Sequence, residues 1–136
     1  QRRRTAYAQS EWGADRVYAL ANDKKHREVI AAVEEIEKLG PVPMTMELQR
    51  LHAYAALGEA QQARQRSEKL LLVHPQSTEL ALFHAEMLMR IKEWKEASQV
   101  LRDIKRAHEG EFAGYQAEQR LKAVPRRENV AKPAWG

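Results

Sequence analysis

Cysteine is absent from the 136 residues, and its absence excludes several kinds of chemistry. A chain without cysteine has no disulfide framework, no thiolate metal site and no cysteine nucleophile. Glycine is scarce, and its six residues form no glycine-rich loop that could hold a phosphate. The longest uncharged stretch is the nine residues from Leu70 to Thr78, whereas a membrane-spanning helix needs about 20 apolar residues. We therefore expect a soluble segment without a transmembrane helix.

Catalytic and metal-binding patterns are also missing. The five histidines are His26, His52, His74, His84 and His108. None of them pairs with another at the i+3 or i+4 spacing that places two ligands on one helix face. The cluster of Glu34, Glu35 and Glu37 is flanked by lysines, which indicates a solvated helix face. The sequence suggests no Ser-His-Asp combination, so we expect a protein that is not an enzyme and has no cofactor or metal.

Nucleic-acid binding is not expected either, because the positive charge is not gathered on the folded body. The chain has a net charge of +4. Residues 1–9 and residues 112–136 each carry a net charge of +3, whereas residues 10–111 carry −2. A nucleic-acid-binding domain instead concentrates lysine and arginine on a surface formed by its folded elements.

Apolar residues recur at intervals of three and four, which is typical of amphipathic helices. Leu48, Leu51 and Tyr54 show this spacing in the middle of the chain. No stretch shows the period-two alternation of a strand, so the sequence predicts an all-α fold. The expected helices cover residues 5–22, 25–39, 44–57, 60–73, 78–91, 94–108 and 112–123.

The helical pattern repeats along the chain with a fixed period, which equals the separation of Pro41 and Pro75. We call this separation the repeat period. The apolar positions that it aligns include Val17, Leu51 and Ala85; Val29, Ala63 and Ala97; and Val33, Ser67 and Leu101, in which Ser67 is the poor member. The period divides the chain into a basic N-terminal segment (1–9), a degenerate repeat (10–43), two further repeats (44–77 and 78–111), a capping or partial-repeat helix (112–123) and a tail (124–136).

The turns within the repeats differ in sequence. Gly58 is suited to the position at the end of a helix where the backbone adopts the left-handed conformation. The first repeat has Asp23-Lys24 at this point and the third has Lys92-Glu93. We expect these two turns either to cost more free energy than the glycine turn or to adopt another cap. At the start of the third repeat, Ser77 and Thr78 precede an apolar run and are candidates for a helix N-cap.

These units of two helices resemble the tetratricopeptide repeat (TPR) family, whose repeats are about 34 residues long. The matching residues are Tyr54, Gly58, Ala63 and Pro75 in the second repeat and Ala85, Trp94, Ala97 and Leu101 in the third. The resemblance covers residues 10–111. It implies antiparallel helix pairs stacked in a right-handed α-solenoid, in which neighbouring pairs stabilise one another.

The resemblance also implies a binding surface. In this family the first helices of the repeats line a concave face that commonly binds an extended peptide or a partner's helix. The corresponding residues selected here are Glu11, Tyr18, Asn22, Thr45, His52, Glu79, Glu86, Met89 and Arg90. The alternative is that apolar members of this row only pack against neighbouring units.

Two functional hypotheses follow from the resemblance. The first is a non-catalytic scaffold that binds another protein or a peptide in its concave groove and is one portion of a longer array, because the chain begins with Gln1 and its last unit is unfinished. The second is a periplasmic TPR segment of a bacterial exopolysaccharide export or secretion protein, which contacts the polymer or docks a polymer-modifying enzyme. A structural spacer is a third possibility.

Overall fold

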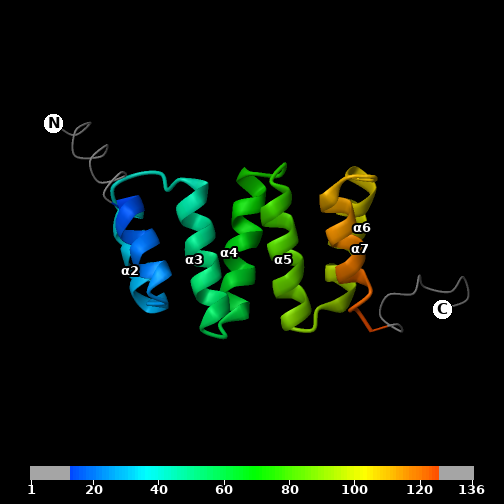
Figure 1. The fold of residues 1–136 in the computed structure, drawn as a ribbon, viewed down its shortest axis with the longest axis horizontal. Coiled ribbons are helices and arrows are strands. Elements are labelled where there is room, and N and C mark those ends of the chain that lie inside the picture. Colours follow the sequence, from blue (N-terminus) through cyan, green and yellow to red (C-terminus); the bar gives the residue numbers. More distant parts are fainter. Residues whose placement is uncertain (1–12, 126–136) are drawn as a thin grey trace, which may run out of the picture. The chain divides into compact units, whose positions relative to one another are not determined.

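A computed structural model describes residues 13–125, and within that range the regular structure is helical, without strands (Figure 1). Residues 13–22 form the first helix. It is followed by α2 (His26–Glu37), α3 (Met44–Ala56), α4 (Ala60–Val73), α5 (Thr78–Arg90), α6 (Trp94–Ala107) and α7 (Phe112–Leu121). The predicted all-α class is confirmed, and the ends of α2–α7 lie within two residues of the predicted ones. None of the described helices is long and apolar enough to cross a membrane.

Several sequence predictions lie wholly or partly outside the described residues. The basic segment 1–9 and Glu11 lie outside them, as do the first residues of the predicted helix 5–22 and of the predicted repeat 10–43 and most of the predicted tail. Val124, which the sequence assigns to the start of that tail, is described and belongs to the packed core with only 5% of its surface exposed.

The helix boundaries recur with the repeat period. The helices α3, α5 and α7 begin at Met44, Thr78 and Phe112, which are evenly spaced. The helices α2, α4 and α6 begin at His26, Ala60 and Trp94, and the same interval separates them. The sequence period is therefore present in the boundaries of the helices as well as in the apolar pattern.

The turn that ends the first helix of each pair has the same backbone geometry in all three cases. Lys24, Gly58 and Lys92 are one repeat period apart and have φ values of 58°, 77° and 64°. Around Gly58, the N–H of Glu59 donates to the carbonyl of Tyr54 at 2.9 Å. The equivalent bonds join Lys25 to Leu20 at 2.9 Å and Glu93 to Leu88 at 2.8 Å. These are the bonds of a Schellman cap, so the lysine turns adopt the glycine geometry and do not use another cap.

The chain divides into two compact units, Gln1–Glu59 (unit 1) and Ala60–Gly136 (unit 2). In unit 1, α2 packs against α3. Its buried core comprises Val17, Val29, Ile30, Ala32, Val33, Ile36, Met46 and Ala53. The helix 13–22 contributes Val17, which has no exposed surface.

A buried arginine joins α2 to α3 in unit 1. Arg50 is 3% exposed, and its guanidinium donates to the carboxylates of Glu47 and Glu37. The shortest of these bonds, from Nη2 to an oxygen of Glu47, is 2.6 Å long. The bonds to Glu37 are 3.0 and 3.3 Å long and cross from α3 to α2. Because Glu47 is itself only 4% exposed, the two buried charges depend on each other.

In unit 2, α5 packs against α4, α6 and α7, and α6 packs against α7. Its buried apolar cluster comprises Leu82, Ala85, Leu101, Ile104, Ala117 and Val124. The N-cap of α5 is Ser77, as predicted, and its hydroxyl accepts from the N–H of Leu80 at 3.3 Å. At α7, a Cβ added to Gly114 would lie 2.3 Å from the carbonyl oxygen of His108, so only glycine permits this close approach.

The shared cap predicts opposite effects of glycine and alanine at equivalent turns. Lys92→Gly should raise the free energy of unfolding by about 1 kcal/mol, because the left-handed conformation costs a side chain about that much. Gly58→Ala should lower it by a similar amount. Urea denaturation followed by circular dichroism measures both. A destabilising effect of Lys92→Gly would show that residue 92 does not have a positive φ in solution.

Because Arg50 is buried, we predict that replacing it alone lowers the free energy of unfolding strongly, and that a second substitution at Glu47 restores most of it. Arg50→Met should lower the free energy of unfolding by about 3–5 kcal/mol, because it removes the buried guanidinium that pairs with the buried carboxylate of Glu47. The Arg50→Met/Glu47→Leu variant should recover most of this loss. Arg16→Ala is the control, since Arg16 pairs with Glu35 at the surface and should cost at most about 1 kcal/mol. Equal losses for the single and double variants would contradict the predicted dependence of one charge on the other.

Candidate functional site

The residues predicted to bind a partner fall into the two units. In unit 1, Tyr18 and Asn22 lie on the helix 13–22, and Thr45 and His52 lie on α3. All four side chains are exposed, and 38% of the surface of Tyr18 is accessible. In unit 2, the predicted residues are Glu79, Glu86, Met89 and Arg90, and all of them lie on α5.

The structure brings three of the predicted residues together in unit 2, in an open groove with a volume of about 430 Å³. The groove is lined by Glu86, Met89 and Arg90 from α5 and by Gln119, Arg120 and Ala123 at α7. The nine residues selected from the sequence include none from α7, although the repeat alignment also places Arg120 at an inward position. The period offers a signal for them, since Arg120 and Ala123 stand one repeat period after Glu86 and Met89. Glu79 does not line the groove.

The groove offers several kinds of contact. Arg90 and Arg120 contribute two guanidinium groups to the lining, and Glu86 contributes one carboxylate. Met89 supplies a flexible apolar side chain, which adapts to partners of different shape. Arg120 also donates to the backbone carbonyl of Gln116, but at 3.4 Å this bond is long. The mixture suits the recognition of a protein surface better than it suits a chemical reaction on a small molecule.

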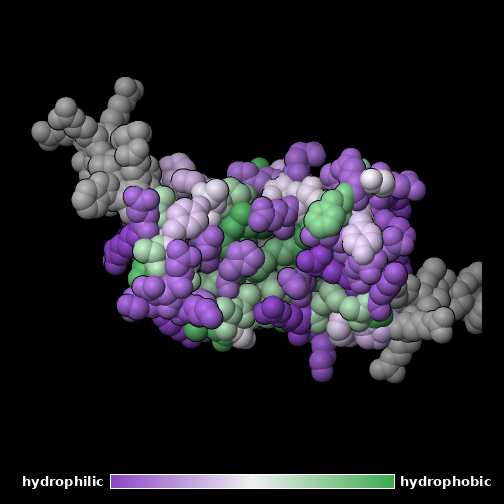
Figure 2. Space-filling view, in the orientation of Figure 1, coloured by the Kyte–Doolittle hydropathy of each residue, from purple (hydrophilic) through white to green (hydrophobic). Residues whose placement is uncertain are grey.

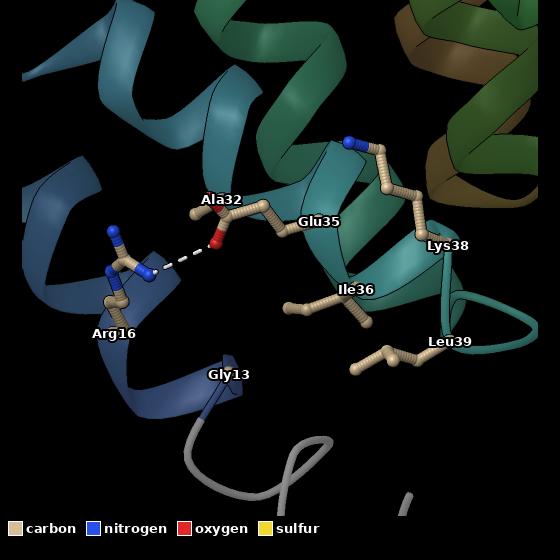
Figure 3. Close-up of a pocket in the computed structure, with 7 residues that line it drawn as sticks. All are labelled: Gly13, Arg16, Ala32, Glu35, Ile36, Lys38 and Leu39. Carbon is tan, nitrogen blue, oxygen red and sulfur yellow. Dashed lines mark hydrogen bonds and ion pairs between the residues drawn. The ribbon is translucent and has the colours of Figure 1, made fainter.

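A second hollow, of about 450 Å³, lies in unit 1 between the helix 13–22 and α2 (Figure 3). Arg16 points across it toward Glu35, with 3.4 Å between the guanidinium and the carboxylate. Both side chains are more than 60% exposed, so water screens the pair. The remaining lining residues are Gly13, Ala32, Ile36, Lys38 and Leu39. No side chain that lines this hollow belongs to the predicted binding row.

A third cavity, of about 260 Å³, is bordered by the first residues of α5 and the end of α6 in unit 2. At its edge, His108 Nε2 lies 3.1 Å from the hydroxyl of Thr78, and His108 Nδ1 lies 2.9 Å from a carboxylate oxygen of Glu111. No sequence pattern indicated this chain of hydrogen bonds, because Thr78 and His108 are far apart in the sequence. The carboxylate of Glu111 is 65% exposed, so water reaches this end of the chain of hydrogen bonds.

A polar contact is buried between α4 and α5. Ser67 has no exposed surface and His84 is 7% exposed. The hydroxyl of Ser67 lies 2.7 Å from Nδ1 of His84. Burial lowers the pKa of His84 below its ordinary value of 6.5, an effect that the carboxylates of Glu68 and Glu96 partly oppose. The imidazole is therefore neutral at pH 7.

Few of the large apolar side chains in residues 13–125 are exposed. Figure 2 shows hydrophilic side chains over much of the face in view, with apolar areas between them. Within this described part, the exposed large hydrophobic residues are Tyr18, Leu39, Leu72, Val73, Phe112 and Tyr115. Among the described residues, no group of three or more histidine, aspartate and glutamate side chains is placed to hold a metal ion.

Comparison of the chain with protein-family models, with curated proteins and with solved structures gives no match.

Proposed function

We propose that this chain is a TPR-like helical scaffold, without catalytic activity, that binds another protein along the face formed by its first helices. The helix pairs, the repeat period of their boundaries and the repeated left-handed cap support the proposal. Ala63 and Ala97 also support it. They occupy equivalent positions of the second helices, and neither has exposed surface. In the TPR pattern a small residue at this position lets the two helices of a pair approach closely.

The groove between α5 and α7 carries the proposal, because it joins three residues selected independently from the sequence. Glu86, Met89 and Arg90 line one continuous hollow with Arg120. Arginine is over-represented among the residues that dominate binding energies, and methionine adapts its shape. The partner is a protein segment that presents an apolar side chain to Met89 and polar groups to the arginines.

The groove variant Met89→Ala/Arg120→Gln tests this function. Both residues are partly exposed, so circular dichroism should show an unchanged helix content. Proteins captured from the native lysate by the wild-type chain should be identified, purified and titrated against both forms. We expect the groove variant to bind the purified partner at least about tenfold more weakly, the loss of one interface hot spot.

Arg106→Gln is the matched control, because Arg106 is an exposed arginine on α6 and does not line the groove. It should bind the partner as the wild-type chain does. Equal affinity of the wild-type chain and the groove variant would contradict binding in this groove. A uniform loss with both variants would indicate attraction by net charge, which salt also weakens.

Binding of a polysaccharide, as in a periplasmic segment of an export protein, is the second candidate. The observation that favours it is a pair of exposed aromatic rings at the start of α7. Phe112 and Tyr115 are 73% and 56% exposed, and their ring centroids are 6.4 Å apart with an angle of 21° between the planes. Isothermal titration with one neutral and one acidic oligosaccharide tests this candidate. A heat of binding that is measured with the groove variant but is absent with the Phe112→Ala/Tyr115→Ala variant would support this candidate.

A further inference from the structure

The cavity at the start of α5 borders a hydroxyl, an imidazole and a carboxylate that are bonded in that order. The hydroxyl of Thr78 lies 3.1 Å from Nε2 of His108, and Nδ1 of the same ring lies 2.9 Å from a carboxylate oxygen of Glu111. An ionised carboxylate only accepts hydrogen bonds, so Nδ1 carries the proton of the neutral ring. Nε2 is then an acceptor, and the hydroxyl of Thr78 donates to it.

This order of groups is the one that activates a hydroxyl as a nucleophile. Nε2 can take the proton of Thr78 while the hydroxyl oxygen attacks an electrophilic carbon. Glu111 acts through His108 and is a positioning residue, because its carboxylate fixes the tautomer of the ring and stabilises the imidazolium that forms. Thr78 and His108 are both half-buried and line the cavity, so a ligand in the cavity can reach the hydroxyl.

The other contact between a hydroxyl and an imidazole in unit 2 lacks these properties. The hydroxyl of Ser67 donates to the carbonyl of Arg64 at 3.0 Å, so its proton is not directed at His84. Ser67 has no exposed surface, and it lines none of the three hollows described above. Thr78 therefore differs from Ser67 both in the direction of its proton and in its access to a ligand.

The start of α5 also favours the negative charge that develops on a carbonyl oxygen under attack. Thr78 and Glu79 are the first two residues of this helix. The first N–H groups of a helix have no carbonyl partner within it, and they lie at the positive end of the helix dipole. Such N–H groups stabilise an oxyanion when they lie close to the nucleophile.

The walls of the cavity suit a short aliphatic chain. The apolar side chains that α5 and α6 contribute to the lining are Ala81, Val100, Ile104 and Ala107. The volume of about 260 Å³ is at the small end for ligand pockets. The carboxylate of Asp103 also lines the cavity and would repel an acidic chain. The lining therefore favours a ligand whose acyl chain is short and uncharged.

We propose that Thr78 is the acceptor site for a short, uncharged acyl group from an activated ester or thioester. The hydroxyl oxygen of Thr78 bonds to the carbonyl carbon, and the bond from that carbon to the leaving oxygen or sulfur breaks. The hydroxyl proton passes to Nε2 of His108 and then to the leaving group. The product is an ester on Thr78, a modification that requires no turnover.

This inference does not depend on the proposed binding function, because the cavity shares no residue with the groove between α5 and α7. The probe for the test is p-nitrophenyl butyrate, an activated ester with a short aliphatic acyl chain. Mass spectrometry of the intact wild-type chain should show the addition of one butyryl group, and peptide mapping should place it on Thr78. Butyryl groups that occur only on lysines or on other hydroxyls would overturn the proposal.

Variants then test the roles of the individual groups. Thr78→Val should abolish the modification, whereas Thr78→Ser, which keeps the hydroxyl, should retain it. His108→Ala should slow the acylation of Thr78 by at least about a hundredfold, the contribution of a general base. Added imidazole should restore part of that rate. The rate is read from the mass of the peptide that contains Thr78, so that hydrolysis of the probe by free imidazole is not counted.

Glu111→Gln should slow acylation less than His108→Ala does, and Glu111→Asp, which keeps the carboxylate, should recover most of the rate. His74→Gln is the matched control, because His74 is an exposed histidine that does not line the cavity, and its rate should equal that of the wild-type chain. Circular dichroism checks that each variant remains helical. A folded His108→Ala variant that is acylated on Thr78 as fast as the wild-type chain would contradict the proposal.

Discussion

The left-handed residue that ends the first helix of each pair is the constraint on which the rest of this structure depends. It occurs at Lys24, Gly58 and Lys92, where the first helix stops and the chain turns into the second. The same pattern of hydrogen bonds closes each of these turns. A turn of constant geometry lets helices of nearly constant length meet at equivalent residues. The buried positions then recur at the same period, and each unit acquires its core from short helices that would not be stable alone.

Most of the fold could be predicted from the sequence because the period and the apolar spacing are properties of many residues together. The helix boundaries followed from them to within two residues. The geometry of the lysine turns did not, because neither Lys24 nor Lys92 is a residue that favours a positive φ. The candidate site was predicted in part: Glu86, Met89 and Arg90 line the groove, whereas Glu79 does not, and Gln119 and Ala123 at α7 were not selected.

Polar contacts between a first helix and the preceding second helix were the least predictable feature. Arg50, His84 and Glu118 occupy equivalent positions, one repeat period apart. Arg50 binds Glu37, His84 contacts Ser67, and Glu118 pairs with Lys105 at 3.7 Å. The first and last of these pairs have reversed charges at equivalent positions. Composition and spacing cannot assign such partners, because each choice depends on which side chain the neighbouring helix presents. Variation at this position gives each helix contact its own chemistry: a buried ion pair, a neutral imidazole or a surface pair.

Backbone NMR tests the central claim, that one capped turn recurs once in every repeat period, most directly. Carbon chemical shifts and the three-bond coupling between the amide and α protons report φ at each residue. We predict a positive φ at Lys24, Gly58 and Lys92, with helical shifts on both sides of each. Helical shifts that continue through Lys24 or Lys92, or a negative φ at either lysine, would contradict it.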